Sequence, residues 1–195
     1  FQDMLPVEAT EYTPPLGVVV AIDTSGSMGS GTGSIKEWAF EGAISMIRHH
    51  LKPDRDYVGI ITFATTATTR VPMTSAAQKK SVIEKIGNYI DSDDNGSSTN
   101  FTPAIELAGS MLNAVNNVSK KHVIIVTDGA PGDDANLYKA AAAENFGNDI
   151  TLSVVITGTL NETNRQNMND LLNAAGGEAE GCKLYVSQNP SDSVD

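Results

Sequence analysis

Three oxygen-bearing side chains follow directly on an apolar run near the start of the chain. Residues 18–22 are all apolar, and the run ends in Asp23, with Ser25 and Ser27 close behind. One carboxylate and two hydroxyls on a short loop are ligands that hard divalent cations such as Mg²⁺ accept. The same composition is also typical of a turn whose short polar side chains bond to the local backbone. Further oxygen donors elsewhere in the chain decide between a metal loop and such a turn.

Two such donors occur far along the chain. Thr99 lies within Ser-Thr-Asn, and Asp128 lies within Thr-Asp-Gly at the end of a second apolar run. The ordered set of Asp-x-Ser-x-Ser, a distant Thr and a distant Thr-Asp-Gly resembles the metal-ion-dependent adhesion site of von Willebrand factor type A domains. The resemblance covers residues 16–186. Three motif pieces at the family's separations favour a metal loop over an isolated turn.

The resemblance implies a site in which Mg²⁺ or Mn²⁺ is held by Asp23, Ser25, Ser27, Thr99 and Asp128. A dication held mainly by hydroxyls keeps positive character and an open coordination position, which attracts a carboxylate. The implied function is therefore a metal-dependent, adhesion-type protein-binding module whose partner protein supplies an Asp or Glu. The family does not imply an enzyme, so we expect no catalytic residues.

A second threonine, Thr102, lies close to Thr99. The family places its threonine just before the residues that lead into a helix, which favours Thr99 as the metal ligand. Thr102 then suits the N-cap of that helix, because Pro103 behind it suits the first helical position.

An acidic stretch in the middle of the chain is a candidate for a second cation site. Asp91, Asp93 and Asn95 alternate before Gly96, as at the opening of a calcium-binding loop. The match fails where a bidentate Glu is needed, because that position is Thr102. A solvated acidic loop is therefore favoured, with an accessory Ca²⁺ site as the alternative.

Alternating strand and helix signals predict the elements that position these donors. Continuous apolar runs predict buried strands, and apolar residues at helical spacing predict helices. Strands are expected at about 16–22, 56–64, 65–71, 123–126, 150–156 and 182–186, and helices at about 34–51, 82–90, 105–115, 135–146 and 164–175. The short separation of the second and third strands predicts a hairpin.

This order of elements indicates an α/β fold. We expect a doubly wound, mostly parallel open sheet with one antiparallel edge strand and helices on both faces, similar to a Rossmann fold. In such sheets, ligands bind beyond the carboxyl ends of the strands. Asp23 and Asp128 both follow predicted strands, so we expect them to lie at the same edge of the sheet.

The chain has room for one domain. Residues 1–15 contain three prolines and no sustained period, which predicts a lead-in segment; residues 16–187 form the expected type A domain, and residues 188–195 a C-terminal tail. We expect the isolated domain to be monomeric. The proline-containing lead-in and threonine-rich strands are typical of a modular extracellular or cell-surface protein, with a cytoplasmic setting as the alternative.

Composition restricts the partners. The net charge of −11, with only 13 Lys and Arg, argues against nucleic acid as a ligand. Cys182 is the single cysteine, so no intrachain disulfide can form. No stretch reaches the roughly 20 apolar residues of a membrane span, and we expect no membrane insertion by these residues.

Alternative functions are less well supported. The main alternative is an intracellular type A domain that acts as an assembly element of a multiprotein complex. A metal-dependent or aspartic-type hydrolase is more distant, because a serine interrupts the Asp-Thr-Gly pattern after Asp23 and no second copy exists. A dinucleotide-binding loop would begin with glycine instead of Asp23, and a serine hydrolase needs a G-x-S-x-G elbow that is absent.

Overall fold

The first apolar run forms the central strand of the sheet. In this computed structural model, β1 spans Leu16–Asp23, and every residue after Leu16 is buried. Such burial is expected of a strand covered on both faces. The strands β2 (Tyr57–Phe63) and β4 (Lys120–Thr127) pair with it in parallel on either side. The structure describes residues 13–90, 96–129, 131–147, 149–177 and 181–187.

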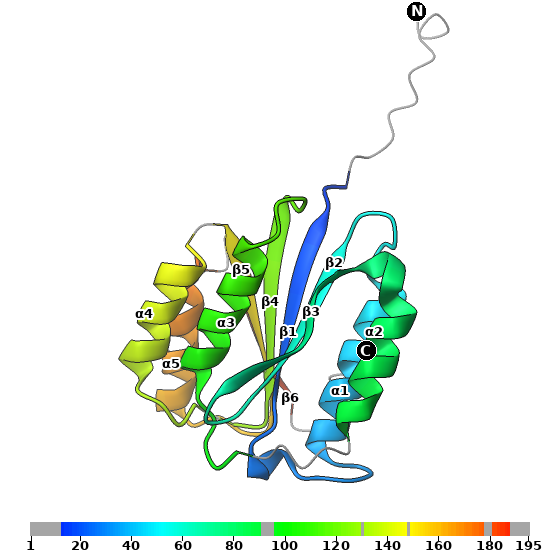
Figure 1. The fold of residues 1–195 in the computed structure, drawn as a ribbon. Coiled ribbons are helices and arrows are strands. Elements are labelled where there is room, and N and C mark those ends of the chain that lie inside the picture. The colour runs from blue at the N-terminus through cyan, green and yellow to red at the C-terminus, as the bar shows by residue number, and fades with distance from the viewer. Residues whose placement is uncertain (1–12, 91–95, 130, 148, 178–180, 188–195) are drawn as a thin grey trace, which may run out of the picture.

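Six strands make one sheet in the order β3-β2-β1-β4-β5-β6 (Figure 1). The strands β5 (Ile150–Thr157) and β6 (Lys183–Ser187) continue the parallel arrangement beyond β4. The strand β3 (Ala67–Ser75) pairs antiparallel with β2, and it contains Pro72, which an edge strand tolerates. The predicted mostly parallel sheet with one antiparallel edge strand is therefore confirmed.

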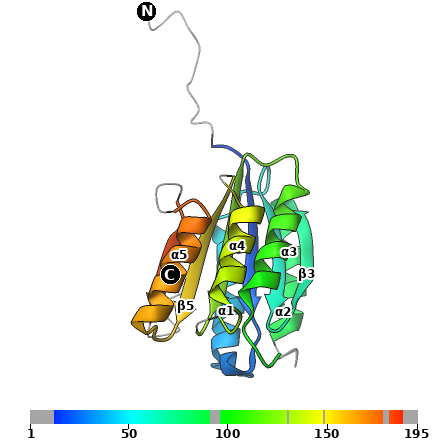
Figure 2. The ribbon, with the colours of Figure 1, turned by 90° about the vertical axis from the view of Figure 1, so that its left-hand side faces the viewer.

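Helices cover both faces of the sheet, as predicted (Figures 1 and 2). One core unites β1, β2 and β3 with α1 and α2, and a second core unites the other face of the sheet with α3, α4 and α5. The helices are α1 (Ile35–His49), α2 (Lys79–Ile90), α3 (Phe101–Asn113), α4 (Ala135–Asn145) and α5 (Glu162–Ala174). None of these described helices is both long and apolar enough to cross a membrane.

The helix starts obey local capping chemistry at α1 but not at α3. Ser34 occupies the N-cap of α1, and its hydroxyl accepts a hydrogen bond from the Glu37 backbone N–H. The predicted N-cap of α3, Thr102, is wrong: the N-cap residue is Asn100, and Thr102 lies inside the first turn. The reason is that the carboxylate of Asp133, from a distant loop, accepts the hydrogen bonds at this helix start.

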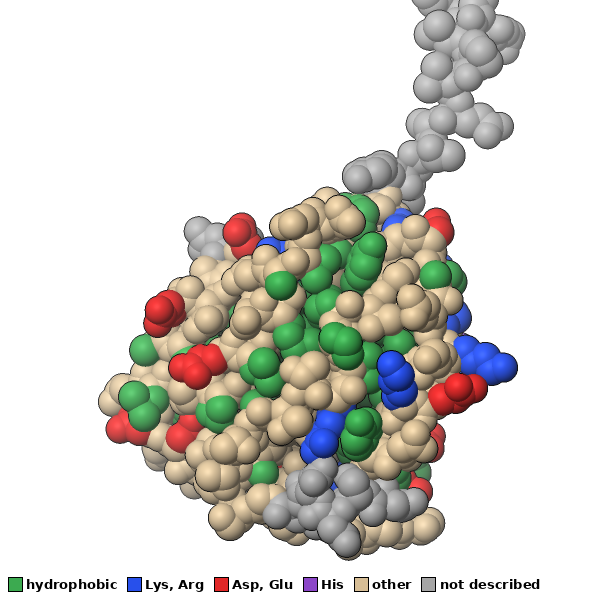
Figure 3. All heavy atoms as spheres, in the orientation of Figure 1, with side chains coloured by type: hydrophobic (Ala, Val, Ile, Leu, Met, Phe, Trp, Pro, Cys, Tyr) green, Lys and Arg blue, Asp and Glu red, His purple; other side chains and the backbone are tan. Residues whose placement is uncertain are grey.

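The antiparallel edge of the sheet faces the viewer in Figure 3, where hydrophobic side chains gather between α3 and α2 over β3. Met73 of β3 and Met111 of α3 are half-buried there and pack against the core of α3. Charged side chains are scattered around this stripe in the same view. The described residues of this face therefore form no basic patch that would suit a nucleic-acid partner.

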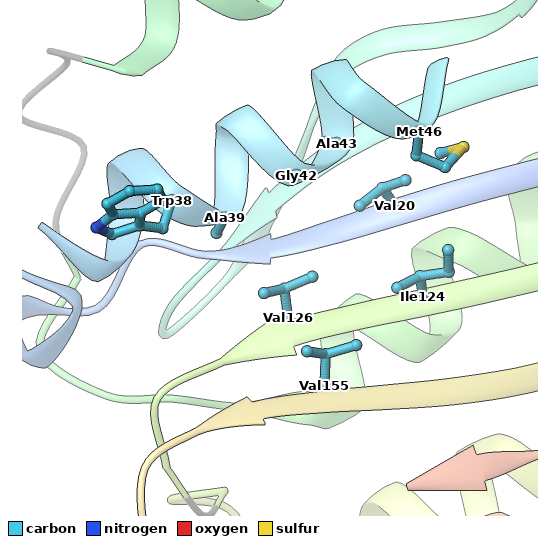
Figure 4. A pocket seen from close by; sticks show the side chains of 9 residues that line it. All are labelled: Val20, Trp38, Ala39, Gly42, Ala43, Met46, Ile124, Val126 and Val155. Carbon is cyan, nitrogen blue, oxygen red and sulfur yellow. The ribbon is translucent and has the colours of Figure 1, made fainter. Parts of the chain in front are cut away.

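On the face that carries α1, an apolar groove of about 170 Å³ lies between this helix and β1, β4 and β5 (Figure 4). Trp38 and Met46 line it from α1, while Val126 and Val155 line it from the sheet. Val126 and Val155 are paired in register, and Val155 pairs with Tyr185 of β6, which is 51% exposed. The apolar sequence of β4 and β5 is thus fully buried on one face only.

His122 of β4 makes stability depend on pH. Its Nδ1 shares a hydrogen bond of 2.6 Å with the Thr151 hydroxyl, and burial lowers the pKa of the imidazole to about 4. In the unfolded chain this pKa is about 6.5, so the unfolded state binds the proton more readily. The stability held by neutral His122 is full above pH 6.5 and falls as the pH drops toward 4.

We therefore expect His122→Gln to reduce the loss of unfolding free energy between pH 7 and pH 5 by up to about 2 kcal/mol. Urea denaturation of both proteins at the two pH values measures this difference. His50→Gln is the matched control, because it makes the same replacement at an exposed position. Equal pH dependence of His122→Gln and the unaltered chain would contradict the prediction.

Candidate metal centre

The candidate centre begins at the carboxyl end of β1. Asp23, the last residue of β1, is fully buried, and its carboxylate accepts hydrogen bonds from the Ser25 backbone N–H at 2.7 Å and the Thr127 hydroxyl at 2.5 Å. Thr127 is the last residue of β4, and parallel pairing of Ile22 with Val126 brings the two strand ends level. Asp23 is therefore held in one orientation by its own loop and by the neighbouring strand.

A chain of side-chain hydrogen bonds connects the other candidate ligands. The Thr99 hydroxyl donates to Ser25 Oγ at 3.1 Å, and Ser25 Oγ shares a hydrogen bond of 3.2 Å with Ser27 Oγ. The Ser27 hydroxyl donates to Asp128 Oδ1 at 3.0 Å. Together with the bond between Asp23 and the Ser25 backbone, these contacts bring all five predicted residues together.

The three loops that carry these residues are also joined through their backbones. In the first loop, the Gly26 N–H donates to the Gly96 carbonyl at 3.2 Å, which links it to the loop before α3. The Gly132 N–H donates to the Thr99 carbonyl at 2.6 Å, which links that second loop to the one after β4. The second loop is anchored further by the Asn100 N–H, which donates to Ala64 at 2.8 Å. Backbone hydrogen bonds thus hold the three loops that carry the candidate ligands against one another.

Burial and charge are graded across the cluster. Asp23 and Ser25 are buried, Thr99 and Asp128 are half-buried, and Ser27 is exposed. Burial raises the pKa of Asp23; the hydrogen bonds from Thr127 and Ser25 oppose this rise, and the nearby charge of Asp128 adds to it. The negative charge of Asp128 beside the buried carboxylate of Asp23 is a setting in which a bound cation relieves repulsion.

The donor set suits a hard cation. Two carboxylates and three hydroxyls supply only oxygen, which Mg²⁺ and Mn²⁺ prefer over softer ligands. Within the described part of the chain, no group of three or more His, Cys, Asp or Glu side chains could hold a metal ion. Hydroxyl ligands would therefore have to complete any site built around Asp23 and Asp128.

The structure also separates the two threonines that sequence reasoning weighed. Thr99 joins the cluster through Ser25, whereas the Thr102 hydroxyl donates to Asp133 at 2.6 Å. The candidate calcium residues Asp91, Asp93 and Asn95 lie outside the described residues.

Sequence reasoning missed two residues that brace the cluster, Thr127 and Asp133. Thr127 stands directly before Asp128 in the Thr-Asp-Gly motif, and this position at a strand end was a usable signal. Asp133 gave no such signal. It stands beside Asp134 just before a predicted helix, and an Asp at that position is typical of an N-cap of the helix that follows it.

Comparison with known proteins assigns the family. The model of the von Willebrand factor type A domain matches residues 17–194, which is most of the chain. The chain belongs to the von Willebrand factor type A family. Such domains are protein-interaction modules in many contexts. A comparison with curated proteins found no match.

Solved structures share the fold of this type A domain at low sequence identity. PilB minor pilin from Streptococcus sanguinis superposes with a TM-score of 0.75 at 15% identity, over 96% of this chain and 60% of that chain. A von Willebrand factor type A protein from Catenulispora acidiphila gives 0.74 at 17% identity, over 93% and 40%. An aerotolerance-related membrane protein from Bacteroides fragilis, with multiple mutations to serines, gives 0.67 at 19% identity, over 91% and 94%.

Proposed function

We propose that this type A domain is a metal-dependent protein-binding module of the adhesion type. Its ligands for Mg²⁺ or Mn²⁺ would be Asp23, Ser25, Ser27, Thr99 and Asp128, and its partner would supply an Asp or Glu oxygen. The observation that carries the proposal is the hydrogen-bonded cluster of these five residues, in which four side chains are linked in series and Asp23 joins through the Ser25 backbone N–H. We assign the domain no catalytic role.

The charge of the cluster supports this function. A bound dication would supply a positive centre with an open position for an incoming carboxylate. Only two of the five ligands are carboxylates, so the protein would balance the charge of the dication without surrounding it with excess negative charge, and the metal could still accept an incoming carboxylate. Ser27 is exposed and Asp128 half-buried, so this end of the cluster is the side that a partner would approach. Asp23 and Ser25, buried beneath, would hold the position of the metal.

We propose an extracellular or cell-surface setting for the parent protein. The similarity in fold to a minor pilin supports this setting, and the expected carboxylate partner would then be another surface or matrix protein. An assembly role in an intracellular complex is the competing possibility. Partner binding in the adhesion-type role would require the metal, whereas binding in an assembly role would not if the assembly surface lies away from the ends of β1 and β4.

Binding of a carboxylate probe tests the proposal. We expect the domain to bind Mg²⁺ in isothermal titration calorimetry, and then to bind a labelled Gly-Glu-Gly peptide at least about tenfold more tightly with Mg²⁺ than with EDTA, since charge-assisted contacts exceed about 1.4 kcal/mol. The matched control peptide is Gly-Gln-Gly, which should bind no better with Mg²⁺ than with EDTA; both peptides are amidated at the C-terminus, so that the glutamate side chain is the carboxylate that distinguishes them. Equal affinity of the glutamate peptide in both buffers would remove the mechanism.

A further inference from the structure

The start of α3 is held by a carboxylate from another loop. Asp133 Oδ1 accepts a hydrogen bond from the Phe101 N–H at 3.0 Å, and Asp133 Oδ2 accepts one from the Thr102 N–H at 2.8 Å. Asp133 Oδ2 also accepts the Thr102 hydroxyl at 2.6 Å. The first N–H groups of a helix have no partner within it, so these bonds satisfy donors that would otherwise be unpaired.

The residue at the N-cap of α3 does not do this work. Asn100 makes no side-chain cap bond; its Oδ1 accepts from the Ser98 hydroxyl at 2.8 Å, and its Nδ2 donates to the Thr65 carbonyl at 3.2 Å. The hydrogen bonds of an N-cap are thus supplied by Asp133, which lies outside the helix and 32 residues beyond Phe101.

This contact joins two of the loops that carry candidate metal ligands. Thr99 stands two residues before Phe101, and Asp128 stands five residues before Asp133. Beside the carboxylate, the Gly132 N–H donates to the Thr99 carbonyl at 2.6 Å. A Cβ on Gly132 would lie 2.7 Å from Ser98 Oγ, so the two loops are in close contact.

We propose that Asp133 is a positioning residue of the metal centre, a role that rests on the proposed function. It makes no contact with the cluster in the described structure; it fixes the loop of Thr99 against the loop of Asp128, so that the hydroxyl and the carboxylate keep one separation. Partners of this kind, one step removed from the metal, commonly change metal affinity 10–100-fold when replaced.

The neighbouring residue Asp134 provides the matched control. It is the same residue type and also caps a helix, because its carboxylate accepts the Asn136 N–H at 2.8 Å at the start of α4. That bond is local to one loop and does not reach Thr99. Loss of a negative charge at a helix start is thus common to both replacements by Asn, whereas loss of an acceptor in the contact between loops belongs to Asp133 alone.

The experiment compares Asp133→Asn and Asp134→Asn by Mg²⁺ titration calorimetry and by amide hydrogen exchange. We expect Asp133→Asn to weaken Mg²⁺ binding at least tenfold and to speed exchange at Phe101 and Thr102. Asp134→Asn should change Mg²⁺ affinity less than twofold and leave exchange at those two amides unchanged. Thermal denaturation without metal reports the loss of stability that both variants share.

The outcomes distinguish this proposal from the proposed function. Unchanged Mg²⁺ affinity in Asp133→Asn, with binding by the unaltered chain, overturns the positioning role alone. An equal loss of affinity in Asp134→Asn also overturns it, because loss of a nearby negative charge would then be sufficient to explain the effect. Absence of Mg²⁺ binding by the unaltered chain overturns both. If Asp133→Asn does not fold, Thr102→Val is the second variant, because it removes only the hydroxyl contact with Asp133. We expect it to weaken Mg²⁺ binding about threefold. Unchanged Mg²⁺ affinity in Thr102→Val would overturn the positioning role.

Discussion

Asp23→Ala is expected to weaken Mg²⁺ binding by more than about 100-fold, since loss of a ligand should exceed the 10–100-fold effect of residues one step removed. Asp23 supplies one of the two carboxylates of the proposed centre. It is fully buried, so a water molecule from the solvent cannot easily take the place of its carboxylate. Isothermal titration calorimetry with Mg²⁺, on protein first stripped with EDTA and then dialysed, measures the change.

The fold should survive this replacement. Removing the carboxylate leaves the Ser25 N–H without its acceptor, which costs about 1–3 kcal/mol, whereas the Thr127 hydroxyl can still donate to the Gly129 carbonyl at 3.5 Å. Part of this cost is offset, because burial and the charge of Asp128 both disfavour an ionised Asp23, as its raised pKa indicates. We therefore expect a folded protein by circular dichroism, with moderately reduced stability.

Two further variants make the result interpretable. Asp23→Asn keeps the shape and one acceptor oxygen but removes the charge, and we expect it to lose most of the Mg²⁺ affinity as well. Asp134→Ala removes an exposed carboxylate outside the cluster and should bind Mg²⁺ as the unaltered chain does. If Asp23→Ala bound Mg²⁺ with undiminished affinity, the site would lie elsewhere in the chain.

Much of this fold could be predicted because the apolar sequence of each central strand by itself indicates that the strand is buried. The run that becomes β1 is apolar at nearly every position, which predicts a strand buried on both faces, and Asp23 stands at its carboxyl end. The antiparallel edge followed from the short link between two β-branched segments. Convergence of Thr99 with Ser25 followed from the family resemblance and not from any local signal, because 74 residues separate them.

What could not be predicted depends on contacts between distant loops. Both Asn100 and Thr102 have the side chains of an N-cap, and nothing local reveals that Asp133 satisfies the helix start instead. Likewise, the apolar run of β4 suggests equal burial on both faces. Ile124 and Val126 are nevertheless only half-buried beside α1, because this burial is decided by which helices pack there (Figure 4).

The candidate centre and the core meet at Phe101. This side chain is fully buried two residues beyond Thr99, and its ring contacts Phe63 edge-on at 5.7 Å and Tyr138 at 5.9 Å between centroids. Phe63 ends β2 and Tyr138 lies in α4, so one ring connects the sheet with two helices. The loop of Thr99 is thereby anchored in two ways, by the apolar packing of Phe101 in the core and by the hydrogen bonds between Asp133 and the start of α3.

We therefore expect Phe101→Ala to lower the free energy of unfolding by about 3–5 kcal/mol, the usual cost of removing a buried phenyl ring and leaving a cavity. Urea denaturation followed by circular dichroism measures the loss. Phe101→Leu keeps most of the volume and should cost less than about 1.5–2 kcal/mol. A loss below about 1.5 kcal/mol in Phe101→Ala would contradict the prediction, because it would mean that the surrounding side chains of α3 and α4 close the cavity and that the ring does not anchor the loop.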